Sequence, residues 1–335
     1  MKKYLYIAIA AATLASCSQD EVMEVAEKQA IQFGNTFVGN STRAVDPSYS
    51  SNTIQSFQLF GTVNNVSIYN NVKVENKTGE NSTTAAGYGA VWYCPVTQYW
   101  IEGAAYKFVA IVDGDKANVT ETTIVDGMPT SISYTADGVT DLLCNTQTRT
   151  GEATNDVVGF TFNHLLSKVK FTVENTTPKA TQFQHEITGI KISNAYSANT
   201  YNVTAKTWGT TPTAATSGQS FDDIVVANDA TSETPVTTDS ENEKLLIPGL
   251  ASVTVEFTHT LYYLSTNEQG EQVKEKVTET AYTGDNALTA SITDGMLANN
   301  SYNFKFSVSV GSPIQFTVTQ APTWTTAPDQ PVTVQ

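Results

Sequence analysis

Alternation of apolar and polar residues is the dominant pattern of this 335-residue chain. Runs in which every second side chain is apolar recur from residue 29 onward, and a period of two is typical of half-buried β-strands. In the first half the pattern predicts strands at residues 29–38, Ser56–Thr62, Val66–Val74, Tyr88–Tyr93, Tyr106–Val112, Ser131–Tyr134 and Val157–Asn163.

The same rhythm resumes after Leu165. It predicts strands at Lys168–Glu174, Ile187–Ser193, Tyr201–Thr204, Ile224–Val226, Lys244–Ile247, Ser252–Leu264, Gln272–Tyr282, Ser301–Val310 and Pro313–Gln320. The Thr-, Ser- and Ala-rich stretch Thr211–Thr238 indicates a loop with one strand inside it. Beyond the N-terminal apolar run, no long segment has the 3.6-residue period of an amphipathic helix.

Many short strands separated by turn dipeptides such as Asp126-Gly127 predict an all-β fold of antiparallel β-sandwiches. A chain of this length exceeds the usual size of one hydrophobic core, so we expect two tandem sandwiches. We place them at residues 44–165 and 166–335, and assign residues 17–43 to a tethered pro-segment that carries the first strand.

The N-terminus resembles an export signal. Lys2 and Lys3 precede the apolar run Tyr4–Leu14, which ends in small residues before Cys17. The run is far shorter than the ~20 residues of a membrane-spanning helix, so residues 1–16 are predicted to be a secretory signal peptide. Cys17 is either incidental or the lipid-modified residue of a lipoprotein.

The lipoprotein interpretation rests on Leu14-Ala15-Ser16-Cys17, which resembles a bacterial lipobox. In such proteins signal peptidase II cuts before the cysteine, and the thiol carries diacylglycerol. Together with a further acyl chain such as palmitate, this gives stable membrane anchoring. Asp20 and Glu21 form either a solvated linker or an acidic signal for display on the outer membrane.

The net charge and the cysteines bear on the partners of the chain and on its disulfides. The 18 basic and 33 acidic residues give a net charge of −15, which argues against nucleic acid as a partner. An exported chain can oxidise its thiols, so Cys94 and Cys144 are a candidate disulfide. Their spacing does not decide whether they meet.

Candidate chemistry is sparse, and we predict that the chain is not an enzyme. His164, His185 and His259 stand far apart, and no hydrolase, zinc or phosphate-binding motif is present. The stretch Asp113–Asn118 is either a calcium loop or an Asp-Gly hairpin turn that needs no metal. No cofactor or metal is therefore expected. The tryptophans fill cores or form a glycan-binding face: Trp92, Trp100, Trp208 and Trp324.

Several motifs together resemble the fimbrillin family, the subunits of type V pili. The motifs are Asp141-Leu-Leu143, the run VGFTFNHLLSKVKF at Val158–Phe171, Tyr93-Cys-Pro95 with Tyr99-Trp100, Leu297–Tyr302, Ile314–Phe316 and Trp324. Their order extends through most of the chain, although Cys94 stands where the family more often has tryptophan.

The resemblance implies two transthyretin-like sandwiches and assembly by strand donation. In this family a trypsin-like or Arg-specific protease removes the first strand, and a strand of a neighbouring subunit replaces it. Here the candidate scissile bond joins Arg43 to Ala44. The candidate donor is Pro313–Val334, whose alternating apolar residues are Ile314, Phe316, Val318, Val332 and Val334.

The implied partners are other pilin subunits, the outer membrane through the lipid anchor, a processing protease and a ligand on a host or bacterial surface. The resulting prediction is an adhesive fimbrial subunit that begins as an outer-membrane lipoprotein and ends in an extracellular fimbria. The alternative is a surface lipoprotein that binds glycans without polymerising. The sequence leaves open whether the subunit belongs to the stalk, the anchor or the tip.

Overall fold

The computed structural model describes residues 29–34, 37–38, 54–77, 92–113, 118–152, 157–177, 182–226, 236–239, 243–322, 324 and 330–332. Three of these stretches, 37–38, 236–239 and 330–332, are described by their main chain only. Cys17, Arg43, Ala44 and Val334 lie outside the described residues.

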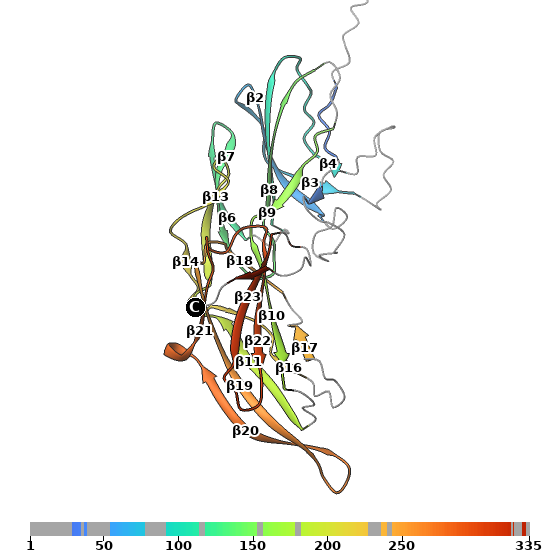
Figure 1. Ribbon diagram of the computed structural model, residues 1–335. Coiled ribbons are helices and arrows are strands. Elements are labelled where there is room, and N and C mark those ends of the chain that lie inside the picture. Colours follow the sequence, from blue (N-terminus) through green and yellow to red (C-terminus); the bar gives the residue numbers. More distant parts are fainter. Residues whose placement is uncertain are drawn as a thin grey trace, which may run out of the picture.

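Two sheets form the upper part of the elongated molecule in Figure 1. The first has seven strands in the order β1 (Phe37–Val38), β9 (Thr161–His164), β8 (Leu143–Thr150), β5 (Ala105–Val112), β2 (Ser56–Val63), β3 (Val66–Asn76) and β4 (Trp92–Tyr93). Neighbouring strands are antiparallel except β1 and β9, which are parallel.

The central strands of this sheet are buried on both faces. On one face Phe57 and Phe108 belong to an aromatic-rich core; on the other, Phe60, Val109 and Ile111 pack under the second sheet. β5 therefore ends as a continuous apolar run, because residues 108–112 face protein on both sides.

The second sheet contains β13 (Thr207–Trp208), β12 (Tyr196–Asn202), β7 (Met128–Thr135) and β6 (Val119–Val125), with β14 (Thr213–Ala214) also paired to β12. β7 precedes residue 165 and β12 follows it, so their pairing joins the two halves of the chain. Ile132 and Tyr134 of β7 and Tyr201 of β12 cover the shared core beneath them.

The lower part of the molecule is a sandwich of two six-stranded sheets. One contains β17 (Val236–Asp239), β10 (Ser167–Asn175), β22 (Ser301–Val308), β23 (Gln315–Ala321), β24 (Gln330–Val332) and β18 (Lys244–Leu246). The other contains β15 (Gln219–Ser220), β11 (Phe183–Ile192), β19 (Ser252–Thr266), β20 (Gln272–Tyr282), β16 (Ile224–Val226) and β21 (Leu288–Ser291).

The core of this sandwich contains Phe171, Phe304 and Phe306 from one sheet and Val255 and Phe257 from the other. β10 and β22 pair in parallel, which the prediction of antiparallel sheets did not include. Residues 176–300 form the long connection that a parallel pair requires. A single short 3₁₀-helix, Gly284–Asn286, is the one helical element of the described residues, and the predicted all-β fold is confirmed.

Two of the three histidines form a pair between β11 and β19. Nδ1 of His185 lies 3.0 Å from Nε2 of His259, and their rings are stacked with centroids 5.2 Å apart. Burial, together with neighbouring His259, lowers the pKa of His185 to about 4, and burial also lowers the pKa of His259. Both rings are therefore neutral at pH 7, and one must keep a bare nitrogen to accept the shared hydrogen bond.

This pair predicts a loss of stability in acid. The folded pKa of His185 lies below its ordinary value of 6.5, so the unfolded chain binds more protons between pH 6.5 and about 4. The free energy of unfolding should fall by about 3 kcal/mol across that window. Urea titrations at a series of pH values measure it, and His185→Gln should remove most of the slope. An unchanged slope in the variant would assign the acid sensitivity to carboxylates instead.

Candidate functional site

The segment Gln29–Gly34 lies inserted between two other parts of the chain in the first sheet's core. It runs antiparallel to the segment around Tyr99 and parallel to the segment around Val158. Four main-chain hydrogen bonds hold it: Ile31 N–H to Gln98 O (2.8 Å), Trp100 N–H to Gln29 O (2.9 Å), Gly34 N–H to Val158 O (3.0 Å) and Val158 N–H to Gln32 O (2.8 Å). The segment is thus bonded on both sides, as an interior strand is.

Side chains of this segment complete the aromatic core. Phe33 is 1% exposed, and its ring centroid lies 5.7 Å from Tyr69, 6.1 Å from Phe108 and 6.4 Å from Phe57. Ile31, two residues earlier, is 5% exposed in the same core. Each such burial contributes about 2–3 kcal/mol, so the segment is an integral part of this core.

Removal of the segment would expose a slot with two properties. The carbonyl of Gln98 and the N–H of Val158 would lose their partners, and the rings around Phe33 would face water. Unpaired strand groups beside an apolar floor are the features that accept another strand. Phe37 and Val38 continue in the same direction as β1, paired with Thr161 and Phe162 of β9.

At the opposite end of the chain, β24 forms the edge of its sheet. It pairs only with β23 among the described strands, with Val332 opposite Val318 and Gln330 opposite Gln320. Phe316 and Val318 of β23 are 9% and 0% exposed in the protein's own core, and half-buried Ile314 packs against that core. Of the predicted donor residues, Val332 alone is a described residue of the edge strand.

Trp324 fixes the chain between β23 and β24. Its ring stacks on His164 with centroids 3.6 Å apart, and buried Asp141 is hydrogen-bonded to Nδ1 of that histidine. The Lys168 ammonium lies 5.6 Å from the Trp324 ring centroid. These four residues come from the motifs on which the resemblance rests, and they meet beside the core that the two upper sheets share.

The remaining candidate residues have structural surroundings. Cys94 is half-buried and Cys144 buried, and both are free thiols, so the candidate disulfide is not formed. Burial raises the pKa of the Cys144 thiol to about 12 and also raises that of Cys94. Trp100 and Trp324 are buried, while Trp92 and Trp208 are half-buried against the same cores.

The candidate calcium loop is only partly described: the Asp113 carboxylate accepts a hydrogen bond from the Val119 N–H at 3.4 Å, and residues 114–117 lie outside the described part. Within the described ranges, no three His, Cys, Asp or Glu side chains group closely enough to hold a metal ion. No helix there is long and apolar enough to cross a membrane.

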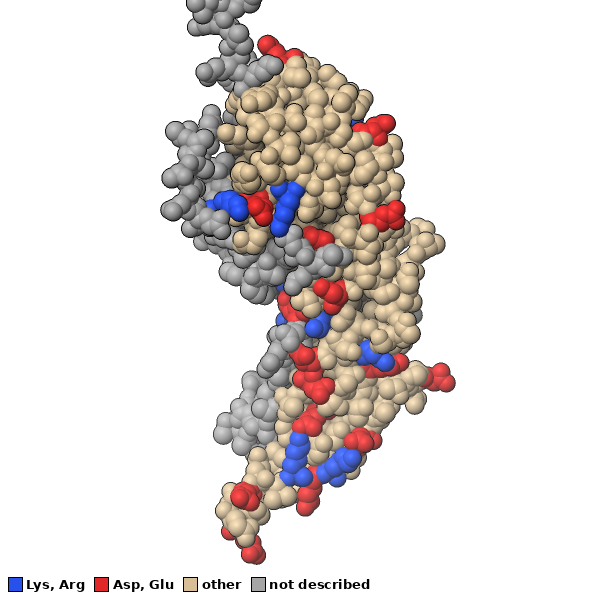
Figure 2. Space-filling model, turned by 180° about the vertical axis from the view of Figure 1, so that it is seen from behind, with Lys and Arg blue, Asp and Glu red and all other residues tan. Residues whose placement is uncertain are grey.

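Surface charge does not favour a polyanionic partner. On the face shown in Figure 2, acidic residues are scattered, and the few basic groups lie beside them. Ion pairs such as Lys191–Glu256 (2.7 Å) and Lys305–Glu174 (3.1 Å) neutralise individual lysines. A nucleic-acid backbone binds where several unpaired cationic side chains cluster, and lysines paired with glutamates do not provide such a cluster.

Comparison with known proteins identifies relatives over most of the chain. The sequence model of the fimbrillin-like family matches residues 42–322. A fimbrial protein from Bacteroides vulgatus has a similar structure, with a TM-score of 0.61, 11% identity, and coverage of 89% of this chain and 100% of that one. A fimbrial assembly protein from Parabacteroides distasonis matches with a TM-score of 0.37, 15% identity, and coverage of 87% and 94%. A search of curated proteins gave no match.

Proposed function

The chain belongs to the fimbrillin-like family and is a fimbrial subunit, and from this premise we propose how it is exported and assembled. It is made as a lipoprotein anchored through Cys17, cut between Arg43 and Ala44, and polymerised by donor-strand exchange. Its partners are neighbouring fimbrial subunits, the outer membrane before cleavage, and the processing protease. The mature subunit lies outside the cell in a fimbria and contributes to adhesion.

The insertion of Gln29–Gly34 into the aromatic core is the observation that carries this proposal. The inserted segment precedes Arg43, so one cut would separate it covalently from the rest of the fold. The matched family region begins at residue 42, close to the proposed cut. A chain that has lost the segment would expose an apolar slot with unpaired main-chain groups, which a strand of another subunit can fill.

The C-terminal end supplies the donor in this proposal. We narrow the detachable part of Pro313–Val334 to the chain after Trp324, because Phe316 and Val318 are needed in the subunit's own core. β24 lies at a sheet edge and can leave β23 without opening that core. Ile314, Phe316 and Val318 then hold the base of the donor, while Val332 and Val334 insert into the neighbour.

Uptake of a peptide tests the slot directly. Purified precursor is cut with an Arg-specific protease and mixed with a labelled peptide of residues 29–38, QAIQFGNTFV. The cut protein should bind the peptide, because the slot matches its main chain and its Phe33 side chain, and excess peptide should suppress polymers. The same peptide carrying Phe33→Asp is the control and should not bind. Cut protein that takes up neither peptide nor subunit would contradict the proposal.

A further inference from the structure

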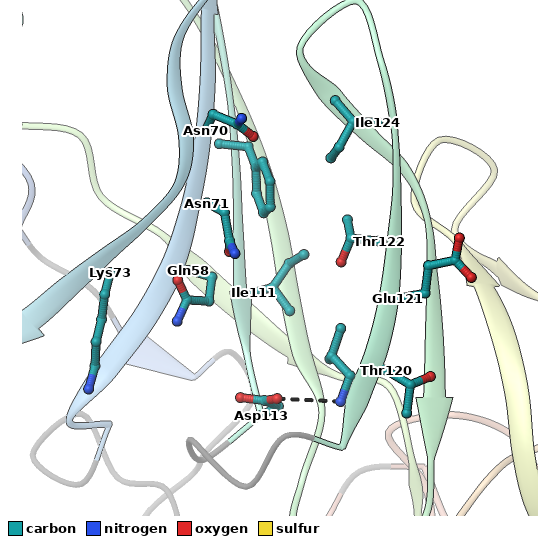
Figure 3. Close-up of a pocket in the computed structure, with 12 residues that line it drawn as sticks. Gln58, Asn70, Asn71, Lys73, Ile111, Asp113, Thr120, Glu121, Thr122 and Ile124 are labelled. Atoms are coloured by element: carbon teal, nitrogen blue, oxygen red, sulfur yellow. Dashed lines mark hydrogen bonds between the residues drawn. The ribbon is translucent and has the colours of Figure 1, made fainter.

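In the part of the chain that the structure describes, the second sheet ends at β6 and leaves part of the first sheet uncovered. An open groove of about 710 Å³ lies there (Figure 3). Gln58 lines the groove on the side of the first sheet, where Phe60 and Ile111 are each only 3% exposed. β6 forms one wall, from which Thr122 and Ile124 point into the groove. The volume lies within the range of small-molecule sites in proteins.

A bulge in β3 directs two amides toward this groove. The β2–β3 register shifts between Leu59 and Gly61, so Asn70 and Asn71 both stand opposite Phe60. Tyr69 and Val72 on either side both face the aromatic core, although residues three apart point to opposite faces in a regular strand. Asn71 has a φ of +53°, the left-handed backbone of such a bulge.

The groove therefore gathers carboxamides that have no other described partner. Gln58 is half-buried, Asn70 and Asn71 are exposed, and none of the three side chains hydrogen-bonds another residue of the described chain. A carboxamide both donates and accepts hydrogen bonds, as a sugar hydroxyl does. Ile124, which is 39% exposed, adds an apolar contact for the C–H face of a ring, whereas Phe60 and Ile111 are each only 3% exposed and offer little surface.

The three amide side chains that line the groove argue against an added strand as the occupant. A peptide paired to the free edge of β6 would press alternate side chains onto Gln58, Asn70 and Asn71, and their desolvation would oppose binding. The slot around Phe33, in contrast, has a floor of aromatic rings. The Phe33 slot therefore suits a strand, whereas the groove suits a polar ligand.

The charged residues that line the groove indicate the charge of its ligand. The ionisable residues lining the groove are Lys73, Asp113 and Glu121, and Glu121 points away from its centre. The Lys73 ammonium lies 3.5 Å from the Glu75 carboxylate. An anionic ligand would meet one partly neutralised cation and the Asp113 carboxylate, so an uncharged ligand fits better.

We propose that this groove binds a short neutral oligosaccharide through Gln58, Asn70, Asn71 and Thr122. The groove and the Phe33 slot lie on opposite faces of the first sheet, so binding does not require polymerisation. A fimbria would repeat the site along its length, and multivalent contact would raise a weak single-site affinity into useful avidity.

Ligand-observed NMR and calorimetry on the uncut monomer test the proposal. The probes are maltotriose, a branched mannotriose and N-acetyllactosamine, with 3′-sialyl-N-acetyllactosamine as the charged counterpart of the last. At least one neutral probe should bind with a Kd of about 1 mM or lower. Asn70→Ala combined with Asn71→Gly should weaken that binding by about tenfold or more, and the glycine preserves the left-handed backbone.

Gln272→Ala serves as the matched control, because it removes an exposed amide of β20 that lies outside the groove. Thermal unfolding establishes that each variant is folded. The proposal is overturned if every neutral probe binds with a Kd above about 1 mM, if the asparagine variant binds as the wild type does, or if the sialylated probe binds better than its neutral counterpart. Binding of an alternating Val-Thr peptide in place of every sugar would likewise overturn it and identify a strand-docking edge.

Discussion

Replacing Arg43 by alanine should hold the protein in its precursor form and abolish polymerisation. The chain has two arginines, Arg43 and Arg149, so an Arg-specific protease has only two candidate bonds. Arg149 lies in β8 opposite Tyr106 of β5, hydrogen-bonded within the sheet. Among the described strands Arg149 is paired on its β5 side only, because β9 pairs with Leu143 and Cys144. Proteases need extended, accessible chain, which a strand hydrogen-bonded to its neighbour does not offer. Cleavage should therefore occur at Arg43 alone.

We expect the wild type to polymerise and Arg43→Ala to form no polymer. Wild-type protein treated with the protease should yield a new N-terminus at Ala44 and a ladder of heat-resistant species on a gel, whereas Arg43→Ala should give neither. Arg149→Ala is the matched control, because it removes the other arginine, and it should assemble as the wild type does. Assembly of Arg43→Ala at the wild-type rate would refute the role given to this residue.

The inserted segment explains why uncut protein should not accept a strand from a neighbouring subunit. Ile31 and Phe33 together bury apolar surface that contributes about 5 kcal/mol, and four main-chain hydrogen bonds add to this. While the segment is covalently attached, its effective concentration at the slot far exceeds that of any neighbouring subunit. Cleavage removes this advantage, so an incoming strand can compete.

Alternation predicted the strands that have one polar and one apolar face, and those whose buried residues are large. β2, β19, β22 and β23 overlap their predicted ranges closely, and so does β20, although none of its residues is buried. β6 and β8 were missed because Thr, Glu, Gln and Asn occupy most of their positions, leaving no apolar period to detect. Such strands form because they pair with neighbouring strands in the sheet, and their own sequence does not reveal them.

The sequence indicated the strand that fills the Phe33 slot but not the polar groove beside β6. The alternating residues Ile31 and Phe33 indicated a first strand, although its insertion between the segments at Gln98 and Val158 required the fold. The polar groove had no recognised signal. The spacing of Tyr69 and Val72, three residues apart in an otherwise alternating strand, could have revealed the β3 bulge. That β6 stops short of covering β3 depends on how the sheets pack, which no local pattern encodes.

Deleting residues 325–335 should prevent a subunit from donating without preventing it from folding. β24 contributes three paired positions at a sheet edge, whereas Trp324 is retained with its contact to His164 and its backbone carbonyl near the Lys168 ammonium (3.5 Å). The free energy of unfolding should therefore change by only about 1 kcal/mol. Protease-treated deletion protein should remain monomeric in gel filtration and electron microscopy. Gln335→Ala alters only the last residue and should assemble normally.

Mixing the two defective proteins tests the direction of assembly. Cut deletion protein has an open slot but no donor, and uncut Arg43→Ala has a donor but a filled slot. Alone each should be monomeric; together they should form a 1:1 heterodimer and nothing larger, because neither free end can react further. The same cut deletion protein should also cap growing wild-type polymers, shortening them in proportion to its amount. Longer species in the mixture, or polymers of the deletion protein itself, would show that residues 325–335 are not the donor and that assembly uses another strand.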